Sequence, residues 1–232
     1  MAEREERERV NDYLLDLYGG DRFARVYEAS NAHREEHALI LAGGVQQCGV
    51  YPSEAVKMRV LAALVQAVGA KRLLEIGCGL GYSALWLADA AGSDATVDTI
   101  DRFPEHTQLA SGFVAEFELS QRVRVLLGEG GDILAGLNGP YDFIHDDGWF
   151  GHQPEYYHRV VELLRHGGLW VLSNWFLLEQ AITGKTTMDW AQFAGPRWGE
   201  DIKAYARALT SDPRLYVSYI MQPSWVALAF KR

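Results

Sequence analysis

The residue types best suited to chemistry gather in the stretch Arg72–Ser83. It reads as a short apolar strand that ends near Glu75, a turn of alternating glycines, and a helix that begins at Tyr82. The alternating glycines are Gly77, Gly79 and Gly81. Glycines let the backbone approach a bound molecule closely, and the free amides of a helix start face that molecule. A strand that turns on glycines into a helix therefore predicts a ligand site.

Two residues of this stretch indicate which ligand the turn binds. The dinucleotide fingerprint has a third glycine where this chain has Tyr82. Glu75 lies two residues before the first glycine, where its carboxylate would repel a docked pyrophosphate. S-adenosylmethionine carries a sulfonium and an ammonium group instead, so a carboxylate is favourable there. The pattern favours S-adenosylmethionine over a nicotinamide dinucleotide.

The next two strands supply the expected nucleoside contacts. Residues 96–100 form a strand that leads to Asp101, which is placed to accept hydrogen bonds from both ribose hydroxyls. Residues 123–127 form a third strand, and the glycine-rich turn at 128–131 could lie flat against adenine or could simply connect to a short helix at 132–137. The expected cofactor-binding residues are Glu75, Gly77, Gly79, Gly81, Tyr82, Ser83, Asp101, Arg102, Gly130, Gly131 and His145.

The stretch Arg72–Ser83 resembles motif I of class I methyltransferases, and Gly79-x-Gly81-Tyr82-Ser83 is similar to the catechol and caffeoyl-CoA O-methyltransferase family. The similarity extends from about Gly44 to the C-terminus. It implies a seven-stranded sheet with strand order 3-2-1-4-5-7-6, and adenine contacts in the turn after the third strand. In similar enzymes the N-terminal helices help to form the substrate pocket or a dimer interface.

The resemblance also implies a divalent cation that two aspartates and an asparagine hold at the ends of strands four and five. In this chain the first aspartate falls on His145 and the second on Ser173, while Asn174 is kept. A lysine expected near the first acid falls on Gly148. Mg²⁺ prefers carboxylates and water over imidazole and a neutral hydroxyl, so we expect no Mg²⁺ site.

Three interpretations of the altered motif remain open. His145 could be the general base, with Asp146 or Asp147 nearby to hold it. Alternatively His145, Asp147 and Asn174, with His152, could bind a transition metal, which accepts mixed nitrogen and oxygen ligands. In the third interpretation His145 only touches the cofactor, and catalysis is by proximity alone. The candidate catalytic residues are His145, Asp146, Asp147 and Asn174.

A long aromatic insert at residues 175–200 interrupts the alternation of strands and helices. Such segments are more often core, but large apolar groups beside an active-site rim also suit a lid over an apolar substrate. The expected pocket residues are Trp149, Trp175, Phe176 and Trp190. The insert favours an aromatic or otherwise hydrophobic methyl acceptor.

The whole pattern predicts a Rossmann-like, doubly wound α/β fold with helices on both faces of a mostly parallel sheet. Strands are expected at residues 72–76, 96–100, 123–127, 141–145, 169–172, 215–220 and 226–230, and the short last connection makes the final pair antiparallel. Helices are expected at 4–41, with a break near Gly19-Gly20, and at 54–68, with Ser53 as N-cap. Further helices are expected after Pro104 and around 200–209. Another is expected to begin at Pro154, to carry Arg165-His166 in its last turn and to be capped by Gly167-Gly168. Residues 1–43 are expected to be a helical extension of a methyltransferase domain at 44–232.

Composition and charge indicate the cellular compartment and the class of binding partner. The 232 residues can bury one sizeable core, and a net charge of −9 argues against nucleic acid as the main partner. No apolar run approaches the length of a membrane span, and we expect the charged start to be a solvated helix rather than a signal peptide. Two cysteines, Cys48 and Cys78, predict no disulfide framework and favour the cytoplasm. The apolar faces of the N-terminal helices predict a homodimer.

The sequence thus predicts an S-adenosylmethionine-dependent O-methyltransferase that acts on a small hydroxylated, aromatic acceptor without a metal. One alternative is a tRNA-modifying methyltransferase of the same family. A second is a protein that binds S-adenosylmethionine or S-adenosylhomocysteine without catalysis, and a third is a nicotinamide-dependent oxidoreductase.

Overall fold

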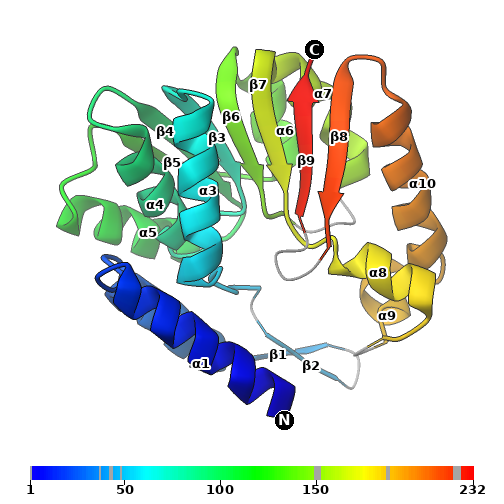
Figure 1. The fold of residues 1–232 in the computed structure, drawn as a ribbon, viewed down its shortest axis with the longest axis horizontal. Coiled ribbons are helices and arrows are strands. Elements are labelled where there is room, and N and C mark those ends of the chain that lie inside the picture. The colour runs from blue at the N-terminus through cyan, green and yellow to red at the C-terminus, as the bar shows by residue number, and fades with distance from the viewer. Residues whose placement is uncertain are drawn as a thin grey trace.

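The computed structural model describes residues 2–36, 38–41, 44–47, 49–148, 153–186, 189–221 and 226–232. They form a seven-stranded sheet with helices on both faces and a separate two-stranded hairpin (Figure 1). The strands are β1 Ala38–Leu41, β2 Gly44–Gln47, β3 Arg72–Ile76, β4 Thr96–Asp101, β5 Val123–Leu127, β6 Tyr141–Asp146, β7 Leu164–Leu172, β8 Leu215–Ile220 and β9 Val226–Lys231. The helices are α1 Ala2–Leu17, α2 Ala24–Glu36, α3 Ala55–Ala67, α4 Tyr82–Ala91, α5 Pro104–Glu116, α6 Gly130–Gly136, α7 Gln153–Leu163, α8 Phe176–Thr183, α9 Ala191–Ala194 and α10 Trp198–Ser211.

The large sheet has the strand order β5-β4-β3-β6-β7-β9-β8. Numbered within the sheet, this is 3-2-1-4-5-7-6, which confirms the expected topology. The pairs from β5 to β7 are parallel, and β9 is antiparallel to both β7 and β8. Because β3 lies in the middle with β4 and β6 beside it, the glycine turn after β3 has the carboxyl ends of both neighbours next to it.

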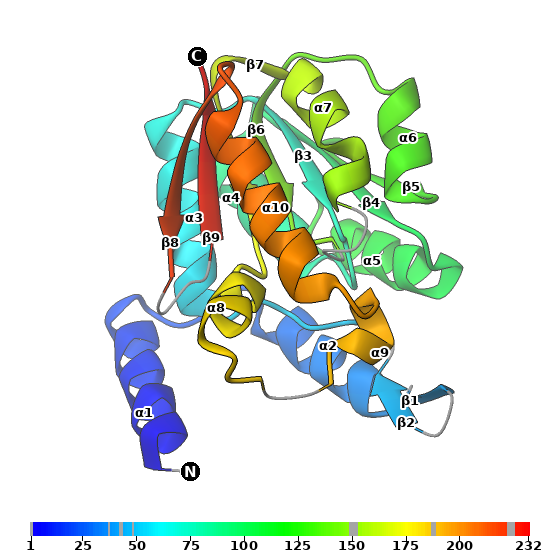
Figure 2. The same cartoon turned by 90° about the vertical axis from the view of Figure 1, so that its right-hand side faces the viewer.

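Helices cover both faces of the sheet (Figure 2), and each face has its own hydrophobic core. One core packs α3, α4 and α5 against the sheet, and the other packs α6, α7, α8 and α10. Side chains alternate between these cores along a strand, so Leu73 belongs to the first and Leu74 to the second. Glu75 comes two residues after Leu73, and His145 comes two residues after Phe143, which belongs to the same core. Both side chains therefore face the α3 side of the sheet.

The N-terminal region differs from the expected helical segment at residues 4–41. Helices α1 and α2 flank the Gly19-Gly20 break as expected, but residues 38–41 and 44–47 form an antiparallel hairpin in place of helix and loop. A four-residue apolar run has no periodicity that separates strand from helix, and this is why the prediction was wrong. The two paired strands lie on either side of position 43, and a domain division at that point stays a prediction.

Two predicted helix ends were also wrong. Helix α3 begins after Glu54, so Ser53 is not its N-cap and its side chain is available for the site. Helix α7 ends at Leu163, and Arg165 lies in β7. Leu164 already pairs with Tyr141, and the register then shifts before Phe143 pairs with Leu169. The two glycines at 167–168 therefore lie in an irregularity of β7 and do not cap a helix.

Candidate active site

A cavity of about 460 Å³, including its open mouth, lies over the glycine turn. Its walls are the loop 49–53, residues 77–80, 82 and 83 of the glycine turn and helix start, Ser30 of α2, and the acids at the ends of two strands, Asp101 and Asp147. Of the expected cofactor residues in the turn, Gly77, Gly79, Tyr82 and Ser83 line the cavity and Gly81 does not. The cavity thus joins the carboxyl ends of β3, β4 and β6, where ligands bind in sheets of this kind.

The turn after β3 needs glycine for conformation and for space. Gly77 has φ +96° and Gly81 has φ +89°, values that residues with a side chain rarely adopt. A Cβ at Gly77 would also lie 2.8 Å from the carbonyl oxygen of Asp147. The turn is therefore pressed against the chain that follows β6, and this brings Asp147 to the cavity wall.

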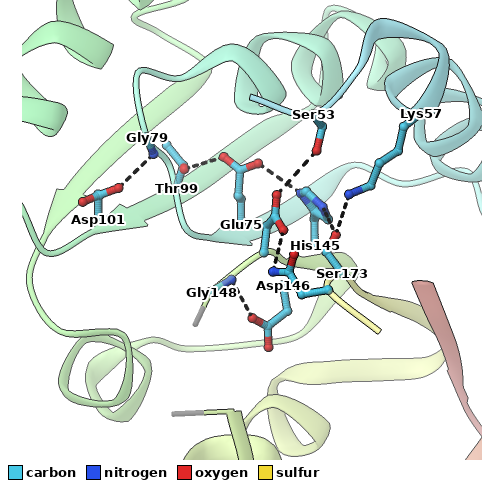
Figure 3. Close-up of polar contacts among 12 residues, drawn as sticks. Ser53, Lys57, Glu75, Gly79, Thr99, Asp101, His145, Asp146, Gly148 and Ser173 are labelled. Atoms are coloured by element: carbon cyan, nitrogen blue, oxygen red, sulfur yellow. Dashed lines mark hydrogen bonds and ion pairs between the residues drawn. The ribbon is translucent and has the colours of Figure 1, made fainter. Parts of the chain in front are cut away.

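Asp101 fixes the turn from the end of β4. Its Oδ2 accepts a hydrogen bond from the Gly79 amide at 2.8 Å (Figure 3). Its Oδ1 accepts another from the Phe103 amide at 3.0 Å and lies 3.3 Å from Nδ1 of His106. The Asp101 side chain is 10% exposed, so one carboxylate both shapes the turn and faces the cavity.

A chain of polar side chains runs through the core on the α3 side of the sheet (Figure 3). We call it the buried polar chain, and its members are Thr99, Glu75, His145, Ser173 and Lys57. Thr99, Glu75 and His145 lie side by side because they share one register across β4, β3 and β6. Thr99 Oγ1 is 2.6 Å from Glu75 Oε2, Glu75 Oε1 is 3.1 Å from His145 Nδ1, and His145 Nε2 is 3.2 Å from Ser173 Oγ. Lys57 Nζ lies 3.0 Å from the same Ser173 Oγ.

The donor and acceptor groups determine the direction of each hydrogen bond in the buried polar chain. Lys57 can only donate, so its ammonium donates to Ser173 Oγ. Ser173 can then donate to His145 Nε2, which leaves the imidazole proton on Nδ1, where it is donated to Glu75. Every bond of the chain is satisfied when the imidazole is neutral and Glu75 is ionised. The chain is thus set to accept a proton at Nε2 of His145.

The structure corrects the predicted neighbours of Glu75 and His145. Glu75 is completely buried, and its two oxygens bond Thr99 and His145 instead of facing the cavity. His145 is also completely buried, so it does not line the cavity, and the carboxylate that holds it is Glu75. Neither aspartate of the pair after it has that role. Strand alternation explains this, because Asp146 faces the α7 side.

Asp146 lies among groups of α7 and the following turn. Its Oδ1 accepts hydrogen bonds from the Gly148 amide at 3.2 Å, from Gln153 at 3.2 Å and from the Tyr156 hydroxyl at 3.3 Å. Among the described residues, its Oδ2 has no hydrogen-bond partner. Burial outweighs these bonds and raises the pKa of Asp146 to about 6.

Asp147 directly follows β6 and lines the cavity. Asn174 donates to its Oδ1 at 3.1 Å, and the Ser53 hydroxyl lies 3.5 Å from its Oδ2. Burial acts to raise the pKa of Asp147, but the charge of Lys57 leads the opposing effects, and the pKa ends below its ordinary value. Asn174 has φ +68°, in the left-handed region that asparagine adopts more readily than most residues with a side chain, and its amide bonds this carboxylate.

The other predicted site residues are spread around this centre. Gly130 and Gly131 form the first turn of α6, and a Cβ at Gly130 would lie 3.4 Å from Ile76 Cγ2. Arg102 is half exposed and lies over the ring of Phe103.

The predicted aromatic pocket residues divide between the core and the part of the chain that is not described. Trp149 and His152 lie outside the described residues. Trp175 is 1% exposed and stacks on Tyr205 in the core, and Trp190 is buried and donates to Gln180. Phe176 is half-buried beside Trp190. In this structure Trp175 and Trp190 serve the packing of α8 and α10 and do not form an open lid.

The residues at the expected metal position do not fit a divalent cation. Both ring nitrogens of His145 are hydrogen-bonded, Ser173 is a neutral hydroxyl, and Asn174 donates to Asp147. The ammonium of Lys57 already bonds Ser173 and would repel a second cation. Within the described ranges, no group of three histidine, cysteine or acidic side chains is arranged to hold a metal.

The sequence reasoning missed three contributors to the site. Lys57 was given no role beyond its place in the helix expected at 54–68, and Ser53 was expected only to cap that helix. Thr99 was read only as part of a strand. A lysine among apolar residues on the core face of a helix was the available signal, because a lysine is rarely buried without a partner.

Comparisons with known proteins agree with this fold and indicate the family. Residues 47–231 match the O-methyltransferase family. A catechol O-methyltransferase of Niastella koreensis is 30% identical over 171 residues, which is 72% of each chain.

Two crystal structures share the fold over nearly the whole chain. The SAH-bound methyltransferase of Podospora anserina has a TM-score of 0.81 at 19% identity, and the match covers 98% of this chain and 96% of that one. The Bacillus cereus O-methyltransferase in complex with SAH has a TM-score of 0.75 at 21% identity, over 96% and 97% of the two chains. Among the helices that the structure describes, none has the length and apolar character to cross a membrane. The chain belongs to the O-methyltransferase family, a family of S-adenosylmethionine-dependent enzymes.

Proposed function

We propose that this protein binds S-adenosylmethionine over its glycine turn and transfers the methyl group to a hydroxyl of a small aromatic acceptor. The observation that carries the proposal is the cavity formed by the turn 77–83 with Asp101 on one side and Asp147 on the other. Asp101 suits the ribose hydroxyls, and the ionised Asp147 suits the cationic end of the cofactor, the place first expected for Glu75. Both related crystal structures named above contain SAH.

We further propose that the acceptor loses its proton without a divalent metal, and that His145 receives that proton. His145 is buried, so the proton arrives through Ser173, whose hydroxyl passes its own proton to Nε2. Glu75 holds the opposite nitrogen and stabilises the imidazolium that forms. A hydrogen bond from Ser173 is also among the effects that lower the pKa of Asp147. The Ser173 hydroxyl can therefore donate to that carboxylate once Nε2 of His145 is protonated.

A catechol-like ring is the acceptor class that we propose. The support is the 30% identity to a catechol O-methyltransferase over 72% of both chains. Methyl transfer between an activated sulfonium and a hydroxyl depends mostly on alignment, so a flat ring held at the cavity mouth is a suitable acceptor. Trp149 and Phe176 remain the predicted contacts to that ring.

We also propose a homodimer in a reducing compartment. Helix α1 carries exposed apolar side chains at helical spacing, namely Val10 at 56%, Tyr13 at 64% and Leu17 at 61% exposure, and we call these three the α1 stripe. Apolar side chains in one row favour burial against a second subunit. The buried free thiol of Cys78 in the glycine turn suits a reducing setting such as the cytoplasm.

Calorimetry and a methyl-transfer assay test the proposed function together. S-adenosylhomocysteine is expected to bind in the micromolar range, a common affinity for small ligands, while NAD gives no heat. Labelled S-adenosylmethionine is expected to transfer its methyl group to catechol. Binding without transfer to any phenol would indicate a binding protein, and binding of NAD in place of S-adenosylhomocysteine would refute the cofactor assignment.

A further inference from the structure

Lys57 has no assigned role, yet it occupies a distinctive position. It lies on the first turn of α3, on the same side of the helix as Leu61, which is 1% exposed in the core. Its side chain is half-buried, and its ammonium donates to Ser173 Oγ at 3.0 Å (Figure 3). Placing a lysine on the core face of a helix is costly unless its charge has partners, so these contacts call for an explanation.

The ammonium of Lys57 acts on both the core and the cavity wall. In the core it bonds Ser173, which is 1% exposed and bonds His145 in turn. At the cavity wall, its charge helps to lower the pKa of Asp147. Ser53, four residues before Lys57, approaches the same carboxylate at 3.5 Å.

Lys57 is the most exposed member of the buried polar chain. Thr99, Glu75 and His145 are 0% exposed and Ser173 is 1% exposed, whereas Lys57 is only half-buried. A proton that travels along the chain to His145 therefore enters at Lys57. An ammonium group has three donors, so it can bond Ser173 and still offer a hydrogen bond to a ligand oxygen.

We propose that Lys57 is a catalytic residue that holds the acceptor oxygen and links it to the buried base. This rests on the proposed function, since it assigns the group that meets the acceptor hydroxyl there. The ammonium is the positive charge that stabilises the developing oxyanion, in a position where the chain's side chains do not fit a divalent cation. Preorganised donors of this kind act most strongly in sites from which water is excluded.

The proton and electron movements balance. The acceptor hydroxyl gives its proton to Lys57 while Lys57 gives one to Ser173 Oγ, and Ser173 gives its own to His145 Nε2. Lys57 ends as an ammonium, His145 as an imidazolium beside Glu75, and the acceptor as an oxyanion bonded to Lys57. The oxyanion then forms the O–CH₃ bond as the S–CH₃ bond breaks, and that electron pair returns to sulfur and cancels its positive charge.

The test compares Lys57→Met with wild type on a series of catechols whose hydroxyls differ in acidity. Loss of the ammonium is expected to lower kcat about 10²-fold for catechol itself, the usual cost of removing one donor to an oxyanion. For 4-nitrocatechol, which is ionised in the assay buffer, the loss is expected to be much smaller. A residue that only supports the fold would lower kcat by the same factor across the series.

Two further variants make the outcome decisive. Lys203→Met is the matched control, because Lys203 pairs with the exposed Glu200 on α10 and is expected to leave kcat unchanged. Lys57→Arg keeps the charge and is expected to recover part of the rate for catechol, and it serves as the test if the methionine variant does not fold. Equal losses for catechol and 4-nitrocatechol, or no loss at all, would overturn the role of Lys57.

Calorimetry separates this inference from the proposed function. Lys57 is not among the residues that line the cofactor cavity, so Lys57→Met is expected to bind S-adenosylhomocysteine within about threefold of wild type. If wild type itself methylates no phenol, the proposed function fails. If wild type is active and the variant shows no dependence on acceptor acidity, only the assignment of Lys57 fails.

Discussion

The substitution Glu75→Gln separates two roles for a completely buried acid of the site. The sequence suggests that Glu75 binds the cofactor ammonium, whereas in the structure its oxygens bond Thr99 and His145. Glutamine keeps the shape, and its amide can still accept from His145 and donate to Thr99. The variant therefore removes the charge and leaves the packing intact.

The size of the effect follows from the contact distance. At an effective dielectric constant of about 20, a carboxylate 3.1 Å from an imidazolium nitrogen contributes at most about 5 kcal/mol. Because the amide oxygen still accepts the hydrogen bond, we expect a loss of about 3 kcal/mol, or roughly 10²-fold in kcat. The dissociation constant of S-adenosylhomocysteine is expected to change by less than about threefold.

The assay measures kcat on catechol at saturating cofactor, with calorimetry for binding. Glu116→Gln is the matched control, since Glu116 is an exposed acid that pairs with Arg25 on the surface. If Glu75→Gln weakens S-adenosylhomocysteine tenfold or more while kcat at saturation is unchanged, then Glu75 acts on the cofactor and the buried polar chain has no part in proton transfer.

Three further outcomes are expected. Asp101→Ala removes the acceptor of the Gly79 amide and is expected to weaken S-adenosylhomocysteine by about 1.5–3 kcal/mol in calorimetry; an unchanged affinity contradicts this. The pKa of Asp146 is raised from 3.8 to about 6, so the folded state binds the proton more tightly and the free energy of unfolding falls as pH rises through that window. Asp146→Asn is therefore expected to be about 1–3 kcal/mol more stable than wild type in urea at pH 7, with the advantage absent near pH 4. Replacing the α1 stripe by serine is expected to convert a dimer to a monomer in light scattering, and a monomeric wild type refutes the proposed dimer.

The central part of the fold could be predicted because its sequence signals are local. Short apolar runs that end in glycine or an acid place β3, β4 and β6, and the order of elements then requires a parallel sheet. Gly77 and Gly81 could be recognised because a tight turn needs positive φ there. Asp101 could be recognised because it ends the strand next to that turn.

The hairpin and the buried polar chain depended on information that is not local. Residues 38–47 have no period that separates a hairpin from a helix, and tertiary context decides between them. Glu75 and His145 meet because β3 and β6 are neighbours in register, although 70 positions separate them in the chain. Lys57 reaches Ser173 across a sheet face, 116 positions away, and nothing near it in sequence indicates that contact.

Methyl transfer to catechol in the presence of excess chelator tests the central claim most directly. Lys57, Ser173 and His145 are proposed to take the acceptor proton without a divalent cation. Turnover in excess EDTA is therefore expected to equal turnover in untreated buffer, and added Mg²⁺ or Zn²⁺ is expected to give no stimulation. If EDTA abolishes methyl transfer and either metal restores it, the cation is part of the site and the account of proton transfer through Lys57 and His145 is wrong.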